Sequence, residues 1–352
     1  MSVPIGRRAI LALPATLAMP HLATAQAAGR VIMASWGGRG AQTYRDVYGA
    51  PFTRETGIPV TVAEVSDPAA AVAAAQGRPQ HNVIVAASYQ AANLANRGLI
   101  QELTPDDIPN VRHIPEEYWV RDRQGKLIGM PTSFLYYGIA YNKELARASD
   151  LQSWHALKDR KWRGQLSITR PVFLGPYDLT LFAKLNGSDE NDIRPGVPML
   201  EAIARNAGAV YTSMASLQTQ LSRGEVAAAP FYSSQVQLLR RAGERQVDII
   251  LPEEGGLNLS YVFAIPKNAP DQEAARRFLN RATDHQAAIG VFREAGSLPL
   301  NPEVVIPAEL EQELGLTMAE VRRRNYAPNW YTIAANLDER VRLAEQIVDR
   351  AR

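Results

Sequence analysis

Short apolar runs alternate with longer amphipathic segments along most of the chain. Three of these runs, residues 31–35, 58–65 and 83–86, are rich in β-branched or small apolar side chains and predict strands. The longer segments between them have the mixed apolar and polar pattern of helices with one buried face. Strands that alternate with helices in this way are typical of an α/β fold.

The predicted helices have recognisable ends. Residues 41–52 predict the first helix, which stops before Gly57, and the alanine-rich residues 72–76 predict the second. A third helix over residues 88–97 begins with a serine that can cap its free amides and ends at Gly98. The first and third strands are therefore each followed closely by the start of a helix.

Two helices are predicted near the C-terminus. The first covers residues 318–324, with Thr317 as its cap. The last helix carries an apolar stripe at helical spacing, and we interpret this stripe as core packing rather than as a partner-binding surface. The stripe consists of Leu337, Val341, Ala344, Ile347 and Val348.

Composition narrows the class of protein. The chain of 352 residues is too long for one ordinary core, so two domains are expected. Lysine and arginine total 38 against 36 acidic residues, and this balance offers no basic surface for nucleic acid. The absence of cysteine excludes disulfides, cysteine nucleophiles and a lipid-anchored cysteine. The histidines are scattered and no catalytic or phosphate-binding motif is present, so we expect no metal, no cofactor and no catalytic residue.

The N-terminal residues have the pattern of a secretory signal peptide. Arg7 and Arg8 precede an apolar run over residues 9–19, and the small residues at 23–27 offer cleavage sites. Prolines interrupt and end this run, which is shorter than the roughly 20 apolar residues of a membrane-spanning helix. The paired arginines also resemble a twin-arginine export signal. We therefore expect residues 1–27 to be a signal peptide that directs the protein to the periplasm.

Five segments of the mature chain carry a family resemblance. They are Ser35-Trp36-Gly37-Gly38, residues 51–58 (PFTRETGI), residues 77–85 (GRPQHNVIV), residues 139–143 (IAYNK) and residues 264–267 (AIPK). In these segments the chain resembles bacterial periplasmic solute-binding proteins of ABC transporters, and among them the spermidine/putrescine-binding branch. The resemblance extends through nearly the whole mature chain.

This resemblance implies the two-lobed α/β fold of type II periplasmic binding proteins, with two crossing segments and C-terminal helices. It places the crossings near residues 134–141 and 260–266, both of which are apolar and β-prone. The C-terminal helices would close back over the second lobe. The predicted division gives residues 30–136 and 261–302 to the first lobe, and residues 137–260 and 303–352 to the second.

Ligands of α/β proteins bind beyond the carboxyl ends of strands, where loops lead into helices. Trp36 follows the first predicted strand, and Gly37 and Gly38 leave accessible backbone amides beside it. Ser88 and Tyr89 hold the same place after the third strand. We predict that these five residues contact the ligand, with a core position for Trp36 and a simple helix cap for Ser88 as the alternatives.

The resemblance implies further contacts from the second lobe and the second crossing, and here the chain departs from the polyamine-binding pattern. Arg170 stands in a Thr-Arg-Pro segment at a position where the family has an acid, and Tyr232 stands where it has tryptophan. In the crossing, Leu259 and Tyr261 occupy the places of a tryptophan and an aspartate. The remaining family contact positions are Ser297 and Tyr331.

These departures bear on the charge of the ligand. A polyamine cation needs carboxylates and aromatic walls to replace its hydration shell, and the matched positions lack the acids. Arg170 instead offers a planar guanidinium that suits a carboxylate. We hypothesise a small amino or hydroxy acid held by Arg170 and backbone amides, with Trp36, Tyr232 and Tyr261 around it. A solvated surface position is the alternative for Arg170.

The sequence thus predicts the periplasmic substrate-binding component of an ABC importer. We expect a monomer whose partners are a small-molecule ligand and the membrane permease of the importer. A polyamine receptor and an extracytoplasmic ligand-sensing subunit are alternatives within the same fold, and a secreted enzyme is an alternative from another class. A neighbouring gene for a permease or for a membrane kinase would distinguish transport from sensing.

Overall fold

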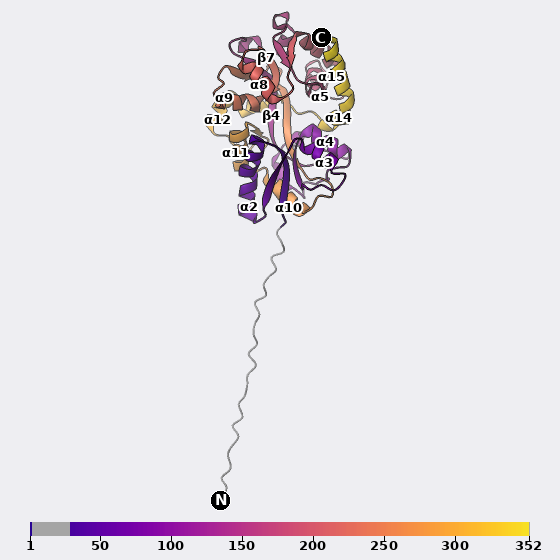
Figure 1. Ribbon diagram of the computed structural model, residues 1–352, viewed down its shortest axis with the longest axis vertical. Helices are drawn as coiled ribbons and strands as arrows, with labels where there is room; N and C mark the ends of the chain where they lie inside the picture. Colours follow the sequence, from indigo (N-terminus) through magenta and orange to yellow (C-terminus); the bar gives the residue numbers. More distant parts are fainter. Residues whose placement is uncertain (2–28, 352) are drawn as a thin grey trace.

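The computed structural model describes Met1 and residues 29–351, so the predicted signal peptide beyond Met1 lies outside the described residues. The molecule consists of two α/β lobes stacked along its long axis (Figure 1). Strands β4 (Met130–Asn142) and β9 (Gly256–Ala264) run between the lobes. The predicted α/β fold with two lobes and two crossing segments is therefore confirmed. No described helix is long and apolar enough to span a membrane.

The first lobe, at the bottom of Figure 1, is built on strands in the order β2-β1-β3-β9-β4. Strands β1, β2 and β3 are parallel, and β9 pairs with β3 in the antiparallel direction. These segments form strands because helices cover the sheet and bury apolar side chains such as Met33, Val83 and Ile84 completely. The bounds are β1 (Val31–Trp36), β2 (Val60–Val65) and β3 (Val83–Ala87).

The first predicted helix of this lobe is longer than expected, the second is displaced, and the third ends within one residue of its predicted limit. The segment after β1 is helical over residues 39–56, with one π-helical turn, and ends where Gly57 adopts a left-handed φ of 71°. The next helix begins at Pro68 because the Asp67 side chain caps it, which moves it toward the N-terminus from the predicted residues 72–76. The bounds are α1 (Arg39–Thr43), α2 (Ala50–Thr56), α3 (Pro68–Ala74), α4 (Ser88–Asn96), α10 (Gln272–Arg281) and α11 (His285–Ala295).

The second lobe, at the top of Figure 1, continues the sheet in the order β4-β7-β5-β6, and β8 also pairs with β4. Strand β5 is parallel to β6 and β7, whereas β4 is antiparallel to β7 and β8. Trp154, Leu166 and Phe182 are completely buried in its core. The bounds are β5 (Leu166–Ile168), β6 (Ala207–Val210), β7 (Ala228–Tyr232), β8 (Val247–Ile250), α5 (Pro171–Phe173), α6 (Leu179–Leu185), α7 (Val197–Asn206), α8 (Met214–Ser222) and α9 (Ser233–Arg241).

Strand β4 joins the two lobes without a break. Its 13 residues are all buried. The part up to Tyr136 pairs with β9, and the part from Tyr137 onward pairs with β7 and β8. Gly138 is needed at this change of partner, because a Cβ there would lie 2.5 Å from the carbonyl oxygen of Ile250. The lobes are thus connected through continuous hydrogen-bonded strands rather than through loops.

The C-terminal segment contacts both lobes. The last helix packs against α5 and α7 of the second lobe, and Ala344, Ile347 and Val348 of its predicted apolar stripe are buried. The helix before it packs against α4 of the first lobe instead. The division of residues between the lobes therefore stays a prediction. The remaining elements are β10 (Leu298–Pro299), α12 (Ala308–Leu314), α13 (Met318–Arg324), β11 (Asn325–Tyr326), α14 (Trp330–Ala335) and α15 (Leu337–Ala351).

Candidate functional site

A cavity of about 390 Å³ lies between the lobes, and we call it the interlobe cleft. The first lobe contributes residues at the ends of β1, β2 and β3, and the second lobe contributes residues after β5 and β7. Leu135 of β4 and Ser260 of β9 line it from the crossing strands. The cleft therefore lies at the sheet edge where α/β proteins bind ligands.

Aromatic side chains form much of the wall of the cleft. Tyr177 meets Tyr89 of the other lobe edge-on, with ring centroids 5.6 Å apart, and meets Tyr232 edge-on at 6.3 Å. Trp36 and Tyr261 make a second edge-on pair at 6.0 Å. Such surfaces can enclose the carbon chain of a small ligand and exclude water from it. The aromatic residues of the cleft are Trp36, Tyr89, Phe173, Tyr177, Tyr232 and Tyr261.

The tyrosine hydroxyls of the cleft stay neutral at physiological pH. Burial raises the pKa of Tyr261 to about 12. Burial also raises the pKa of Tyr89, Tyr177 and Tyr232 above the ordinary tyrosine value. These hydroxyls can donate and accept hydrogen bonds, but they cannot supply negative charge to balance a bound cation.

Two oppositely charged side chains line the cleft, one from each lobe. Asp67 caps α3 in the first lobe, and Arg170 directly precedes α5 in the second. The Arg170 guanidinium lies over the ring of Phe173, 5.3 Å from its centroid, and forms no salt bridge within residues 29–351. The cleft thus presents one positive and one negative group. Among the described residues, no cluster of acidic or histidine side chains could hold a metal ion.

The structure brings half of the predicted contact residues into this cleft. Trp36 and Tyr89 come from the ends of β1 and β3, as the loop argument predicted. Arg170, Tyr232 and Tyr261 come from the positions that the family resemblance indicated. Their roles in ligand binding stay predictions. Arg170 lines the cleft and is also exposed to solvent, so a solvated surface position is still its alternative.

The two glycines after Trp36 do not line the cleft. The Gly38 amide donates a hydrogen bond to Glu64 Oε2 at 3.0 Å. Glu64 in turn pairs with Arg45, with an N to O distance of 2.6 Å. A Cβ on Gly37 would lie 2.7 Å from the same Glu64 oxygen. The structure therefore places a carboxylate of the protein itself where we expected the glycine amides to meet a ligand.

Three further predicted residues also lie outside the cleft wall. Ser88 is buried behind it, where its hydroxyl donates to the carbonyl oxygen of Ser260 at 3.0 Å and lies 2.7 Å from Ser260 Oγ. Ser297 is buried next to β10. Tyr331 lies on α14, in a separate groove. Ser88 thus links α4 to β9, which is a structural contact that positions Tyr89.

Several cleft residues were not predicted from the sequence, and Asp67 and Tyr177 are the most informative of them. Asp67 precedes a proline at the end of the second predicted strand, so a search for caps at every strand end could have found it. Tyr177 lies in a π-helical turn over Leu174–Asp178, and no local pattern indicates which way this turn faces. The other polar side chains of the cleft are Ser66, Gln90, Ser234 and Gln235.

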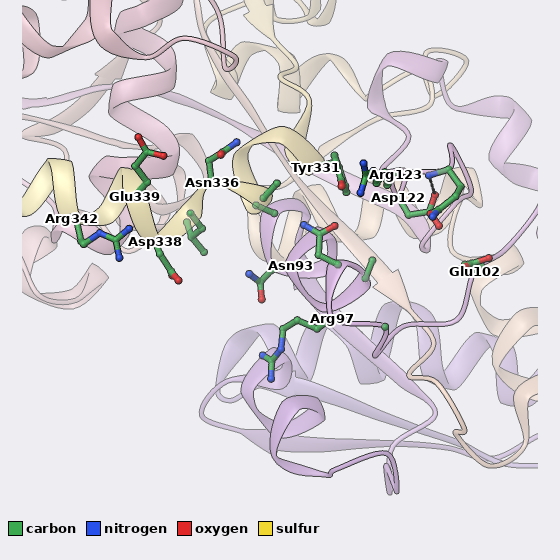
Figure 2. Close-up of a pocket in the computed structure, with 17 residues that line it drawn as sticks. Asn93, Arg97, Glu102, Asp122, Arg123, Tyr331, Asn336, Asp338, Glu339 and Arg342 are labelled. Atoms are coloured by element: carbon green, nitrogen blue, oxygen red, sulfur yellow. Dashed lines mark hydrogen bonds between the residues drawn. The ribbon is translucent and has the colours of Figure 1, made fainter.

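A larger groove of about 910 Å³ lies outside the cleft, between α4 and the helices α14 and α15 (Figure 2). Figure 2 shows Arg97, Asp338 and Arg342 spread along its rim, and these side chains are exposed. Tyr331 is the one aromatic residue among those that line it. The lining of this groove is thus mainly polar and charged, whereas six aromatic side chains line the interlobe cleft.

Two α/β lobes, two crossing strands and an aromatic cleft between the lobes are the features of a solute receptor. The chain belongs to the bacterial extracellular solute-binding protein family, whose model matches residues 48–317. This membership confirms the predicted family, and it agrees with the prediction of a binding protein rather than an enzyme.

Individual relatives are distant. The chain is 22% identical over 272 residues to the spermidine/putrescine-binding periplasmic protein 1 of Haemophilus influenzae, and the match covers 74% of each chain. An ABC transporter substrate-binding protein from Bradyrhizobium japonicum has a TM-score of 0.76 at 21% identity, covering 90% of this chain and 99% of the other. The Atu4243-GABA receptor has a TM-score of 0.73 at 17% identity, covering 91% and 97%. At these identities the solved structures show a shared fold.

Proposed function

We propose that this protein is the periplasmic substrate-binding component of an ABC importer, and that it captures a small carboxylate-bearing solute, an amino or hydroxy acid. The family membership and the names of the similar proteins support the transport role. The solute would enter the interlobe cleft while the lobes are apart. Closure around it would then create the form that the membrane permease recognises, because the ligand stabilises the closed arrangement by its higher affinity for it.

The observation that carries the choice of ligand is the position of Arg170. Its guanidinium lines the cleft and has no carboxylate partner among the described residues. A guanidinium can hold a carboxylate through two parallel hydrogen bonds. The neighbouring aromatic rings would exclude water and strengthen this contact.

The names of the curated relatives suggest a polyamine as the second candidate. Two features of the cleft argue against it. The cleft has a single carboxylate, that of Asp67, and its tyrosines are neutral. Enclosing a dication or trication would therefore leave positive charge unbalanced next to Arg170, which costs several kcal/mol in a site that excludes water.

The replacement Arg170→Ala tests the proposed function. A thermal-shift screen of the mature protein against amino acids, hydroxy acids and polyamines should show stabilisation by carboxylate-bearing compounds. Arg170→Ala should weaken their binding about 10- to 100-fold, since it removes a charge-assisted hydrogen-bonded contact. The matched control is Arg163→Ala, an exposed arginine beyond the other end of β5.

Two results would overturn the proposal. One is a strong thermal shift with spermidine or putrescine and none with carboxylates. The other is an unchanged dissociation constant for the carboxylate in Arg170→Ala. Loss of binding in Arg163→Ala as well would show that removing any arginine of this lobe disturbs the cleft, and would equally remove the argument for Arg170.

A further inference from the structure

We infer that the ligand is a zwitterion, an amino acid whose carboxylate meets Arg170 and whose ammonium group meets Asp67. This inference rests on the proposed function, since it takes the interlobe cleft as the binding site. It adds a second specificity-determining residue, and it excludes the hydroxy acids that Arg170 alone would accept.

The carboxylate of Asp67 is held in place by the helix that it caps. Its Oδ1 accepts hydrogen bonds from the amides of Ala69 and Ala70, at 2.8 and 3.1 Å. Its Oδ2 has one weak partner among the described residues, the Nε2 of Gln90 at 3.5 Å. A carboxylate oxygen can accept two hydrogen bonds, so Oδ2 keeps capacity for a ligand ammonium group. Asp67 and Gln90 both line the cleft.

Asp67 and Arg170 line the same cavity as Tyr89, and both charges influence the Tyr89 hydroxyl. Burial is the main cause that raises the pKa of Tyr89, and the negative charge of Asp67 raises it further. Arg170 lowers the same pKa from the other lobe. The cleft wall thus combines a negative charge from the first lobe, Asp67, with a positive charge from the second, Arg170.

Charge balance in the closed cleft then selects among ligand classes. An amino acid matches both groups, because its carboxylate pairs with Arg170 and its ammonium with Asp67. A hydroxy acid leaves the Asp67 charge uncompensated once water is excluded, and a dicarboxylate places a second anion near it. A diamine leaves a cation beside Arg170. The aromatic walls can add cation–π attraction for the ammonium group.

The experiment is calorimetric titration of the mature protein with matched compounds. The probes are the common α-amino acids, the straight-chain ω-amino acids, the hydroxy acids and dicarboxylates of the same chain lengths, and the corresponding diamines. We expect amino acids to be the tightest binders. The analogue in which a hydroxyl replaces the amino group should bind about 10- to 100-fold more weakly than its parent amino acid.

Asp67→Asn is the variant that separates charge from folding. Asparagine caps helices as well as aspartate does, so α3 should keep its N-terminus while the cleft loses its negative group. We expect about 10- to 100-fold weaker binding of the amino acid and little change for its hydroxy analogue. The matched control is Asp284→Asn, because Asp284 caps α11 through the amides of Gln286 and Ala287 and does not line the cleft.

The outcomes distinguish this inference from the proposed function. If hydroxy acids or dicarboxylates bind as tightly as amino acids and Asp67→Asn changes neither, the inference is wrong and the carboxylate receptor stands. If diamines bind tightest, or if nothing in the panel binds, both are wrong. Equal losses for the amino acid and its hydroxy analogue in Asp67→Asn would show that Asp67 only shapes the cleft, and this would also overturn the inference.

Discussion

The carboxyl group of Asp178 lies directly behind the aromatic wall of the cleft. It accepts a hydrogen bond of 3.1 Å from the hydroxyl of Tyr137, whose ring packs against Tyr177 and Tyr232. Burial raises the pKa of Asp178 to about 7, against the lowering effect of the Tyr137 hydrogen bond. A group that supports the ligand-binding surface therefore changes its charge near neutral pH.

The titration of Asp178 should appear in the stability of the protein. Between about pH 4 and pH 7 the folded protein keeps a proton that the unfolded chain has lost, so the free energy of unfolding falls as the pH rises through this window. The contribution is at most about 4 kcal/mol.

Asp178→Asn removes the titration and keeps a side chain that can hydrogen bond to Tyr137. Urea unfolding at several pH values should show the variant gaining stability relative to the wild type from pH 4 to pH 7. A difference that does not vary with pH would contradict the prediction.

At the scale of single elements, side chains next to the helix ends set where helices begin. Asp67 starts α3 earlier than the alanine-rich segment suggested, and Thr317 starts α13 where the sequence predicted. Thr317 forms a reciprocal box with Glu320: its hydroxyl accepts from the Glu320 amide at 3.2 Å, and its own amide donates to Glu320 Oε2 at 3.0 Å. The same local chemistry therefore shapes the cleft at α3 and the C-terminal core at α13.

Removing the cap of α13 should lower stability by a modest, measurable amount. Thr317→Ala leaves amides of the first turn without a partner and should reduce the free energy of unfolding by about 1 kcal/mol. Thr317→Ser keeps the hydroxyl and should stay close to the wild type. Chemical denaturation of the three proteins provides the comparison. Equal losses in both variants would point to the lost methyl group rather than to the cap.

At the scale of the whole molecule, the largest cluster of buried apolar side chains extends through both lobes. Ile84 of the first lobe, Leu166 of the second and Ile347 of the last helix belong to one cluster of buried apolar side chains. Strands β4 and β9 pass through both lobes, and α14 packs against α4 while α15 packs against the second lobe. Each lobe also has a smaller cluster of its own, around Phe278 in the first lobe and around Phe231 in the second, but the shared cluster joins the two interiors.

We therefore expect the mature protein to unfold in one cooperative transition. The sharing of a core means that losing one lobe would expose buried surface of the other. Thermal unfolding followed by tryptophan fluorescence and by far-ultraviolet circular dichroism should give coincident curves. Two separated transitions would show that the lobes are energetically independent despite their shared strands.

Much of the fold and part of the site were predictable from local patterns. Strands and helices follow from the spacing of apolar residues, and the loops after β1 and β3 placed Trp36 and Tyr89 correctly at the cleft. Comparison with the family pattern found Arg170 where an acid was expected. Trp36, Tyr89 and Arg170 each lie at or just after the end of a strand, so the neighbouring residues in the sequence determine where they lie in the fold.

Only the tertiary structure decided which groups meet. Glu64 accepts a hydrogen bond from the Gly38 amide, although the two residues are 26 positions apart in the sequence. No local pattern of glycines could show this contact. Asp67 and Arg170 come from different lobes, and the sequence has no periodicity that relates them. The sequence by itself determined the alternation of strands and helices, because side-chain size and polarity act locally. The composition of the cleft was decided by tertiary structure, because sheet order and the two crossing strands bring distant loops together.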